Sequence, residues 1–248
     1  MPDISYQLYC SRNFPPLIDT LRMLSNAGYR EIEGYGGLYS DLDTLKDGID
    51  QTGLHLSSGH FGVDMLENDV NAALNVARYF KMRGVYGPHL QPDERPTDAA
   101  GWTAFGARLQ EMSKPFLDAG FKFGWHNHAF ELEPISSGEL PLDLMIAAAP
   151  DVSLELDIGW VFRAGLDPVA TIEKYAGRIS AAHIKDLAPE GENADEDGWA
   201  DVGHGILDWP AITAALQATG TTHYVIEHDN PADHFRFATR SLATLKAL

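Results

Sequence analysis

The feature that most constrains the fold is a regular alternation of short apolar runs with longer stretches of helical periodicity along the chain. Spread over 248 residues, eight such units leave about 31 residues each, close to the roughly 30 residues of a strand–helix unit. This alternation predicts parallel strands joined by helices. The predicted strands begin near Ile4, Glu31, Leu54, Gly84, Lys122, Val152, Ile179 and Thr222.

The stretches between the strands have helix boundaries that can be read from the sequence. Pro15 and Pro16 precede a helix that Gly28 ends, because glycine is common just past a helix. Asp167-Pro168 has the pattern of an N-cap followed by the first helical residue. Further helices are predicted over residues 69–82, 98–119, 209–219 and 231–248.

Eight units predict an α/β fold, a closed (β/α)8 barrel with residues 1–248 as a single domain. The alternative is an open doubly wound sheet, which often has a glycine-rich first turn. The cluster Gly34–Gly37 follows the second strand instead, and it fits neither the dinucleotide fingerprint nor the P-loop. The polar insert Pro189–Asp201 follows the seventh strand, so we expect it on the functional face.

The charge balance excludes several classes of partner. The chain has 36 acidic and 18 basic residues, a formal net charge of −18, which argues against binding to nucleic acid or an anionic membrane. One cysteine cannot form an internal disulfide, and no signal peptide or membrane span is visible. We expect a soluble cytoplasmic protein with a small-molecule partner.

In a barrel of this kind, catalytic residues lie at the carboxyl ends of the strands. Seven of the eight predicted strands end in a carboxylate or a histidine. Imidazole and carboxylate ligands without thiolate suit Mn, Zn, Fe, Co or Mg, so the pattern predicts a site for one divalent metal ion. The residues concerned are Glu33, His60, His89, His126 with His128, Asp157, His183 with Lys185 and Asp186, and Glu227 with His228.

Six segments together resemble the xylose-isomerase-like TIM-barrel family, which contains sugar phosphate isomerases and epimerases, inosose dehydratases and endonuclease IV. The resemblance covers essentially the whole chain. Its most specific parts are the aspartate, the His-x-Lys-Asp segment and the last-strand glutamate. The segments are residues 28–33, 124–128, 153–160, 164–168, 177–186 and 224–227.

The resemblance implies four metal ligands: one residue on the fifth strand, then Asp157, His183 and Glu227. On the fifth strand this sequence has His126 where epimerase members have glutamate. His128 is the rival of His126 for that role. We expect the two histidines to point to opposite sides of the strand, so that only one reaches the metal.

Two further departures accompany this one. Trp160 stands where many members have histidine, and Gly203-His204-Gly205 stands where Gly-Glu-Gly is expected. The pair of histidines on the fifth strand is closer to the inosose dehydratase branch. The literal sequence His-Asn-His is not the nuclease motif of that name, whose residues are dispersed in a ββα unit.

The resemblance implies a metal-dependent isomerase or epimerase that acts on a sugar or keto-polyol. Proton abstraction next to a carbonyl would give a metal-stabilised enediolate. Glu227 is the predicted base, and Lys185 and His128 are candidates for the opposing acid. The predicted substrate contacts are Glu33, His60, His89, Trp125 and Trp160, the two tryptophans forming an apolar wall.

Several alternatives stay open at this point. A dehydratase or lyase, acting on an inosose or a 3-keto-sugar, would use the same metal platform. An endonuclease IV-like enzyme is disfavoured by the net charge and by Trp160, and a non-catalytic sugar-binding barrel is a further reading. Glu131 and Glu133 are expected to be solvated charges, and His204 and His228 are left without a role. The substrate, the metal and any homo-oligomer are not fixed by the sequence.

Overall fold

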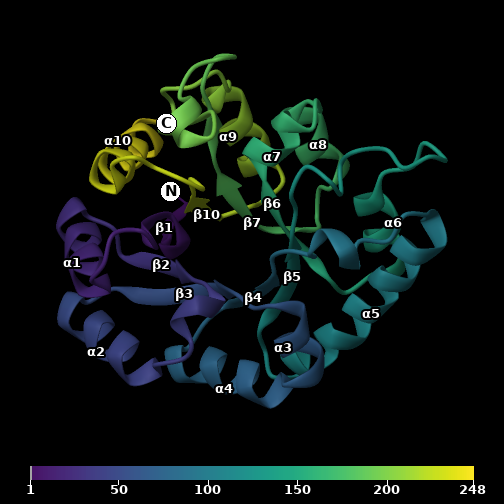
Figure 1. Cartoon of the computed structure of the whole chain (residues 1–248), viewed down its shortest axis with the longest axis horizontal. Coiled ribbons are helices and arrows are strands. Elements are labelled where there is room, and N and C mark those ends of the chain that lie inside the picture. The colour runs from purple at the N-terminus through teal and green to yellow at the C-terminus, as the bar shows by residue number, and fades with distance from the viewer. Residues whose placement is uncertain (1) are drawn as a thin grey trace.

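The computed structural model describes residues 2–248 and confirms the predicted architecture. Eight parallel strands form a closed barrel, and helices surround it (Figure 1). Every one of these strands begins within one residue of its predicted start. The strands are β1 (Asp3–Gln7), β2 (Glu31–Gly34), β3 (His55–His60), β4 (Gly84–Gly87), β5 (Lys122–His126), β6 (Ser153–Asp157), β7 (Ile179–Ile184) and β10 (His223–Ile226).

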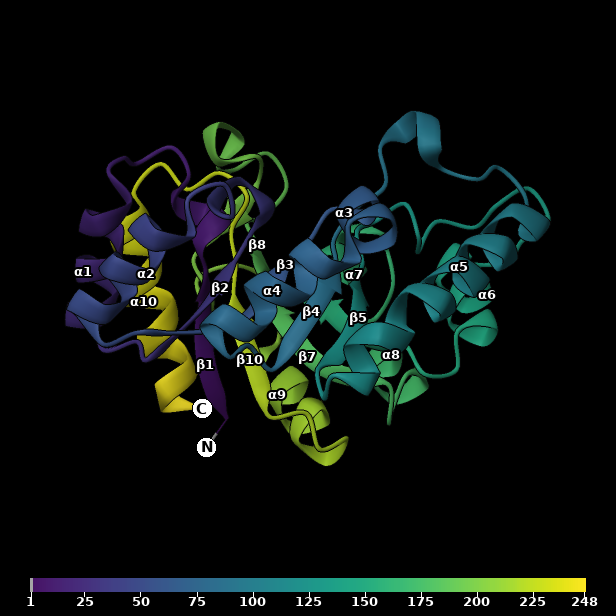
Figure 2. The same ribbon diagram turned by 90° about the horizontal axis from the view of Figure 1, so that it is seen from below.

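The barrel closes because β1 pairs in parallel with β10 on one side and with β2 on the other. Since all eight strands run the same way, their carboxyl ends meet at one end of the barrel. Figure 2 shows this end at the top, with both chain termini at the bottom. The register sets Asp157 beside His183 and His126 beside Glu155 at that end.

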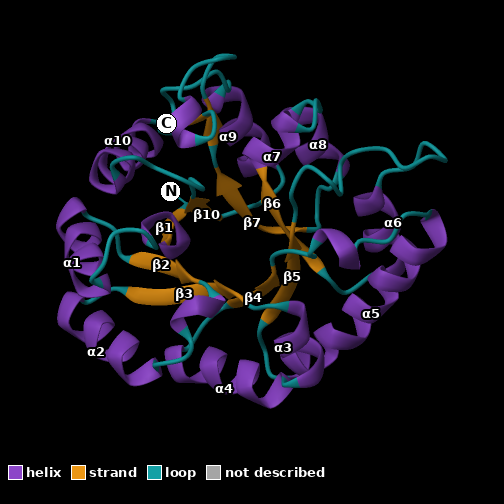
Figure 3. Cartoon of the chain, in the orientation of Figure 1, coloured by secondary structure: helices purple, strands orange, loops and turns teal. Residues whose placement is uncertain are grey.

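Figure 3 shows the helices as a ring outside the strands. The boundary residues act as the sequence predicted: Gly28 ends α1 with a φ of 99°, and the Asp167 carboxylate caps α8 by accepting the Ala170 N–H. The helix predicted over 69–82 is shorter, since Lys81 takes the left-handed conformation and ends it. The helices are α1 (Leu17–Ala27), α2 (Leu42–Thr52), α3 (Val63–Asn68), α4 (Val70–Phe80), α5 (Ala99–Asp118), α6 (Pro141–Ala148), α7 (Ile158–Arg163), α8 (Pro168–Lys174), α9 (Trp209–Ala218) and α10 (His234–Ala247).

Strand β6 illustrates how the barrel separates apolar from polar side chains. Leu154 and Leu156 are fully buried in the hydrophobic core. Glu155 and Asp157, which alternate with them, are equally buried but belong to the polar cluster inside the barrel. A strand with this alternation has one face toward the helices and the other toward the barrel axis.

The polar insert after β7 contains β9 (Trp199–Ala200), which pairs antiparallel with β8 (Asp186–Leu187) just before the insert. It lies at the carboxyl end of the barrel, as predicted, because the Trp199 ring packs beside Lys185. None of the helices in the described part of the chain has both the length and the hydropathy needed to cross a membrane.

Candidate active site

A cavity of about 500 Å³ opens at the carboxyl ends of the strands. Strand ends and the loops that follow them form its walls. Several of the residues predicted to bind metal or substrate therefore face one space. Those that line it are His60, His89, His126, His128, Trp160 and Glu227.

The four predicted metal ligands converge beneath this cavity. His126, Asp157, His183 and Glu227 each offer one nitrogen or oxygen atom, and these four atoms lie within 4.8 Å of one another. They come from β5, β6, β7 and the residue after β10. We call them the outer set. They are distant in sequence and adjacent in space because each ends a neighbouring strand or lies directly beyond it.

The outer set has the properties that a divalent cation requires. Asp157 is fully buried; its Oδ1 accepts the Trp160 N–H at 2.8 Å, and its Oδ2 has no hydrogen-bond partner. Burial raises the pKa of this carboxyl well above its usual range. Its nearest cationic groups, Lys185 Nζ and His183 Nδ1, are each 3.9 Å from Oδ2. A buried carboxylate oxygen without a hydrogen bond is costly, and a metal ion would give it a direct ligand contact. Imidazole and carboxylate ligands suit zinc and similar ions.

His183 is held in place by carboxylates on both sides. Its Nδ1 lies 2.9 Å from Glu227 Oε2, and its Nε2 lies 2.8 Å from Glu33 Oε1. A carboxylate on the second nitrogen is the usual way in which proteins orient a metal-ligating histidine. Burial opposes protonation, but Glu155 and Glu227 outweigh it and raise the pKa of His183 in the metal-free protein.

Lys185 is fully buried beside the outer set. Its Nζ lies 2.7 Å from Asp229 Oδ1 and 3.3 Å from Glu227 Oε2. Burial disfavours its charge, but Asp229 and Glu227 outweigh that effect and raise the pKa of Lys185. Burial likewise opposes ionisation of Glu227, yet Lys185 and His183 hold its pKa well below the usual range. An ammonium and a carboxylate therefore stand in contact next to the cavity.

The two histidines of β5 and the following loop are neighbours. The expectation that they point to opposite sides is wrong, because both line the cavity and the His126 and His128 ring centroids are 5.0 Å apart; even within one strand, residues two apart would share a side. Only His126 belongs to the outer set. Burial, aided by His183, lowers the pKa of His126 to about 3. Burial also lowers the pKa of His128 well below its usual range, so both are neutral at pH 7.

The five predicted substrate contacts divide into two groups. His60, His89 and Trp160 line the cavity. Glu33 lies inside the barrel, where it accepts hydrogen bonds from Gln7 and Ser58 as well as contacting His183. Burial and the neighbouring Glu155 raise the pKa of Glu33 to about 7. Its position suits a residue that supports His183.

Trp125 is the other residue that the structure places away from the cavity lining. Its ring packs against Phe105 of α5, with centroids 5.2 Å apart, and its indole N–H donates to Glu131 at 2.9 Å. Glu131 itself was expected to be a solvated charge, and this is wrong. It is fully buried and also accepts the His128 backbone N–H, which fixes the start of the loop. Burial raises its pKa to about 8. Glu133 is exposed as expected.

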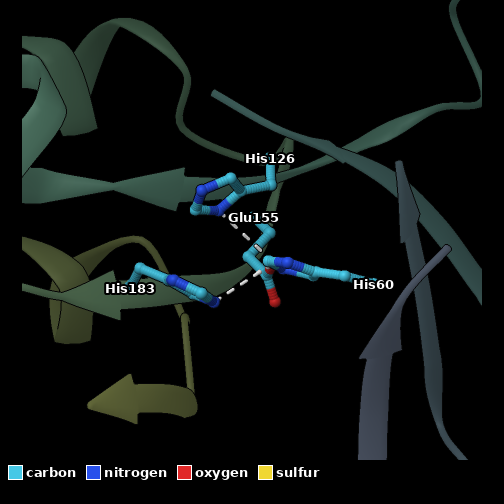
Figure 4. Close-up of side chains that lie close together, drawn as sticks. All are labelled: His60, His126, Glu155 and His183. Carbon is cyan, nitrogen blue, oxygen red and sulfur yellow. Dashed lines mark hydrogen bonds and ion pairs between the residues drawn. The ribbon is translucent and has the colours of Figure 1, made fainter. Parts of the chain in front are cut away.

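Three residues of the site were not predicted from the sequence: Glu155, Trp199 and Asp229. Glu155 lies at the centre of a second cluster with His60, His126 and His183 (Figure 4). Its spacing of two residues from Asp157 was the available signal, because strand residues two apart face the same way. Trp199 lies in the two-residue strand β9 and Asp229 in a loop, and neither segment is long enough or regular enough for spacing to give such information.

The backbone N–H groups of Gly203 and Gly205 form hydrogen bonds within the protein and are not free to bind a phosphate. Both glycine N–H groups donate to Asp186 Oδ2, at 2.8 and 3.2 Å. A Cβ on Gly205 would lie 2.1 Å from the Leu187 carbonyl oxygen, so only glycine is accommodated there. The Asp186 carboxylate thus occupies the donors that a phosphate would need.

Comparison with known families and proteins gives consistent matches. The family described as "Xylose isomerase-like TIM barrel" matches residues 21–247. The rhizopine catabolism protein MocC of Rhizobium meliloti is 27% identical over 269 residues, covering 94% of this chain and 82% of that protein. An inosose dehydratase of Geobacillus kaustophilus is 27% identical over 191 residues, covering 67% of this chain and 61% of the dehydratase.

Solved structures agree with the fold. A sugar phosphate isomerase/epimerase from Parabacteroides distasonis has a TM-score of 0.83 at 20% identity, covering 99% of this chain and 94% of its own. The IOLI protein with a bound zinc atom has a TM-score of 0.75 at 16% identity, covering 100% and 97%. At these identities the similarity shows the fold alone.

Proposed function

The chain belongs to the xylose isomerase-like TIM barrel family, and from that premise we propose that it is a divalent-metal-dependent isomerase or epimerase of a sugar or keto-polyol. The observation that carries the proposal is the outer set: two imidazoles and two carboxylates converge below an open cavity, and Asp157 Oδ2 has no hydrogen-bond partner. The zinc in the structurally similar IOLI protein supports the choice of cofactor class.

A divalent cation held by the outer set would supply Lewis acidity next to the substrate carbonyl. Glu227 is the base in this proposal: it is ionised, it lines the cavity, and it takes the proton from the carbon next to the carbonyl. Lys185 touches Glu227, and its ammonium stabilises the negative charge that develops on the substrate oxygen.

The remaining groups hold the substrate and exclude water. Trp160 lines the cavity as an apolar wall, and the buried Trp199 supports it from behind, with ring centroids 4.8 Å apart. His60 and His89 offer hydrogen bonds to hydroxyl groups. The absence of a free phosphate cradle at Gly203 and Gly205 favours an unphosphorylated substrate.

A dehydratase or lyase is the second candidate function. It is favoured by His128, whose neutral imidazole faces the cavity where it could shuttle a proton to a leaving hydroxyl. The relatives that are inosose dehydratases support this candidate too. The same Glu227 would remove the proton, and the two functions differ in whether water leaves.

The test is proton NMR and mass spectrometry of keto-sugars and inososes incubated with Mn²⁺-loaded protein in D₂O. Isomerisation or epimerisation conserves mass apart from exchanged deuterium, whereas dehydration loses one water. Glu227→Gln serves as the matched negative control. Saturable binding with neither exchange nor product across the panel would contradict both enzymatic candidates and favour a sugar-binding barrel.

A further inference from the structure

A second group of potential metal ligands lies beside the outer set. His60, His126, Glu155 and His183 come from β3, β5, β6 and β7, and their ligand atoms lie within 4.8 Å of one another. Figure 4 shows the three imidazoles directed toward the Glu155 carboxylate. We call these residues the inner set; it shares His126 and His183 with the outer set.

The three imidazoles surround a single oxygen atom. Glu155 Oε2 lies 2.6 Å from His60 Nε2, 3.2 Å from His183 Nε2 and 3.5 Å from His126 Nδ1. Four ligand atoms around a tetrahedral zinc, at bond lengths of about 2.0–2.2 Å, would lie roughly 3.3 Å apart. The three oxygen–nitrogen separations bracket that value, and all four ligand atoms lie within 4.8 Å of one another, so modest side-chain adjustments would admit an ion.

Hydrogen bonding alone leaves this group unsatisfied. His126 Nδ1 and Glu155 Oε1 have no hydrogen-bond partner, although the two residues are only 2% and 0% exposed. Unpartnered buried polar atoms are uncommon and costly. Two of them in one cluster of known ligand types point to a bound cation and not to a packing arrangement.

His183 determines how the two sets relate. Its Nδ1 faces Glu227 of the outer set, and its Nε2 faces Glu155 of the inner set. A neutral imidazole has one lone pair, because its other nitrogen carries the proton. His183 can therefore ligate an ion in one set only. Bound to an outer ion through Nδ1 it would donate from Nε2 to Glu33, and bound to an inner ion through Nε2 it would donate from Nδ1 to Glu227.

We propose that the barrel has a second divalent-metal position, formed by His60, His126, Glu155 and His183, and that one ion occupies either the inner or the outer position. Three nitrogens and one oxygen suit Zn²⁺ or Co²⁺. His60 and His126 line the cavity, which gives the ion a route inward. The part of this proposal in which one ion alternates between two positions rests on the proposed function, which assigns an ion to the outer set. The existence of the inner position does not depend on that assignment.

The experiment measures Co²⁺ binding to chelator-treated protein without substrate, so its result is independent of any failure to find turnover. Each set has two residues of its own, which permits matched variants: Asp157→Asn/Glu227→Gln removes the outer position, and His60→Gln/Glu155→Gln removes the inner one. Equilibrium dialysis with metal analysis gives the stoichiometry, and visible absorption reports the ligand geometry.

We expect one Co²⁺ per chain in the wild-type protein and in each double variant, with different absorption spectra for the two variants. The variant that combines all four substitutions should bind at least about 100-fold more weakly. A folded Asp157→Asn/Glu227→Gln protein that binds no Co²⁺ would overturn the inner position. Two ions per wild-type chain would overturn the alternation.

A second measurement covers the case in which a double variant does not fold. Wild-type crystals grown with excess Co²⁺ are examined by anomalous diffraction at the cobalt edge. Density among the four inner ligand atoms, alone or divided between the two positions, supports the proposal. Density confined to the outer position overturns it.

Discussion

The two ends of the barrel contain similar charged side chains but hold them differently. At the amino end, Arg83 pairs with Asp3 at 2.8 Å and also with Glu31, and the Arg83 and Asp3 side chains are 44% and 53% exposed. At the carboxyl end, Lys185 pairs with Asp229 and Glu227 while it is itself fully buried. Water solvates the first group; the second depends on its protein partners.

The two cavities show that the burial of charged groups, and not cavity volume, distinguishes the candidate active site. The cavity at the amino end, near Arg30 and Lys246 between α9 and α10, is the larger, about 660 Å³ against about 500 Å³. Yet both candidate metal sets within residues 2–248 lie at the carboxyl end. Convergent buried groups with unsatisfied atoms, and not volume, identify the reactive end of a barrel.

The largest expected effect is on turnover. Glu227→Gln keeps the shape of the side chain but removes both the base and an anionic ligand of the outer set, so kcat should fall by about 10³-fold or more on a confirmed substrate. Glu31→Gln, the same change at the amino end, should leave kcat within about twofold. Steady-state kinetics measures both, with circular dichroism to verify folding. Near-normal turnover of the Glu227 variant would contradict the proposed role of Glu227 as the base.

The next largest effect is on the stability of the metal-free protein. Lys185→Met leaves Asp229 and Glu227 without their buried cation, so the free energy of unfolding should fall by about 3–5 kcal/mol. Lys174→Met is the matched control, since Lys174 pairs with Asp143 on the surface and should cost at most about 1 kcal/mol. Urea unfolding measures both. Equal losses of unfolding free energy in the two variants would mean that the buried ion pairs of Lys185 contribute no more to stability than the exposed pair of Lys174.

A histidine at the amino end allows a test by pH. His223 is buried against Ser5, and burial lowers its pKa to about 4. The unfolded chain binds this proton below pH 6.5 and the folded chain does not, so the stability that His223 contributes is present above 6.5 and is lost as the pH falls toward 4.

His223→Gln keeps a partner for Ser5 without titrating. Between pH 7.5 and 4.5 the wild-type protein should lose about 2 kcal/mol more unfolding free energy than the variant. Urea unfolding at each pH gives the difference, in which contributions from the other histidines cancel. Parallel curves for the two proteins would show that His223 does not titrate differently on folding.

The fold was predictable because its signals are local. Apolar runs and helix-ending residues such as Gly28 depend on a few neighbours in sequence, which is why each strand start was placed within one residue. The metal-ligand candidates followed from the same knowledge, since parallel strands must end together. That knowledge supplied strand-end candidates, and the family resemblance then selected Asp157, His183 and Glu227 among them, with His126 or His128 from the fifth strand.

The direction of a side chain was harder to predict than its position along the chain. Trp125 and His126 are adjacent in β5, so only one of them can face the barrel interior; with His126 inward, Trp125 packs on α5. This alternation also pairs Glu155 with Asp157, a signal that was present but not used. Glu131 lies in a loop, where no periodicity predicts burial.

The smallest expected effect is at the amino-end ion pair. Arg83→Met removes contacts to the exposed Asp3 and to Glu31, whose side chain is 18% exposed, from an arginine that is itself 44% exposed, and exposed pairs contribute about 0–1 kcal/mol. The loss should shrink further in about 1 M NaCl, where the screening length is only about 3 Å, and kcat should not change. Urea unfolding at low and high salt measures this. A loss of unfolding free energy above about 2 kcal/mol would mean that the stability of the amino end also depends on paired charges. Solvent exposure would then not explain the difference between the two ends of the barrel.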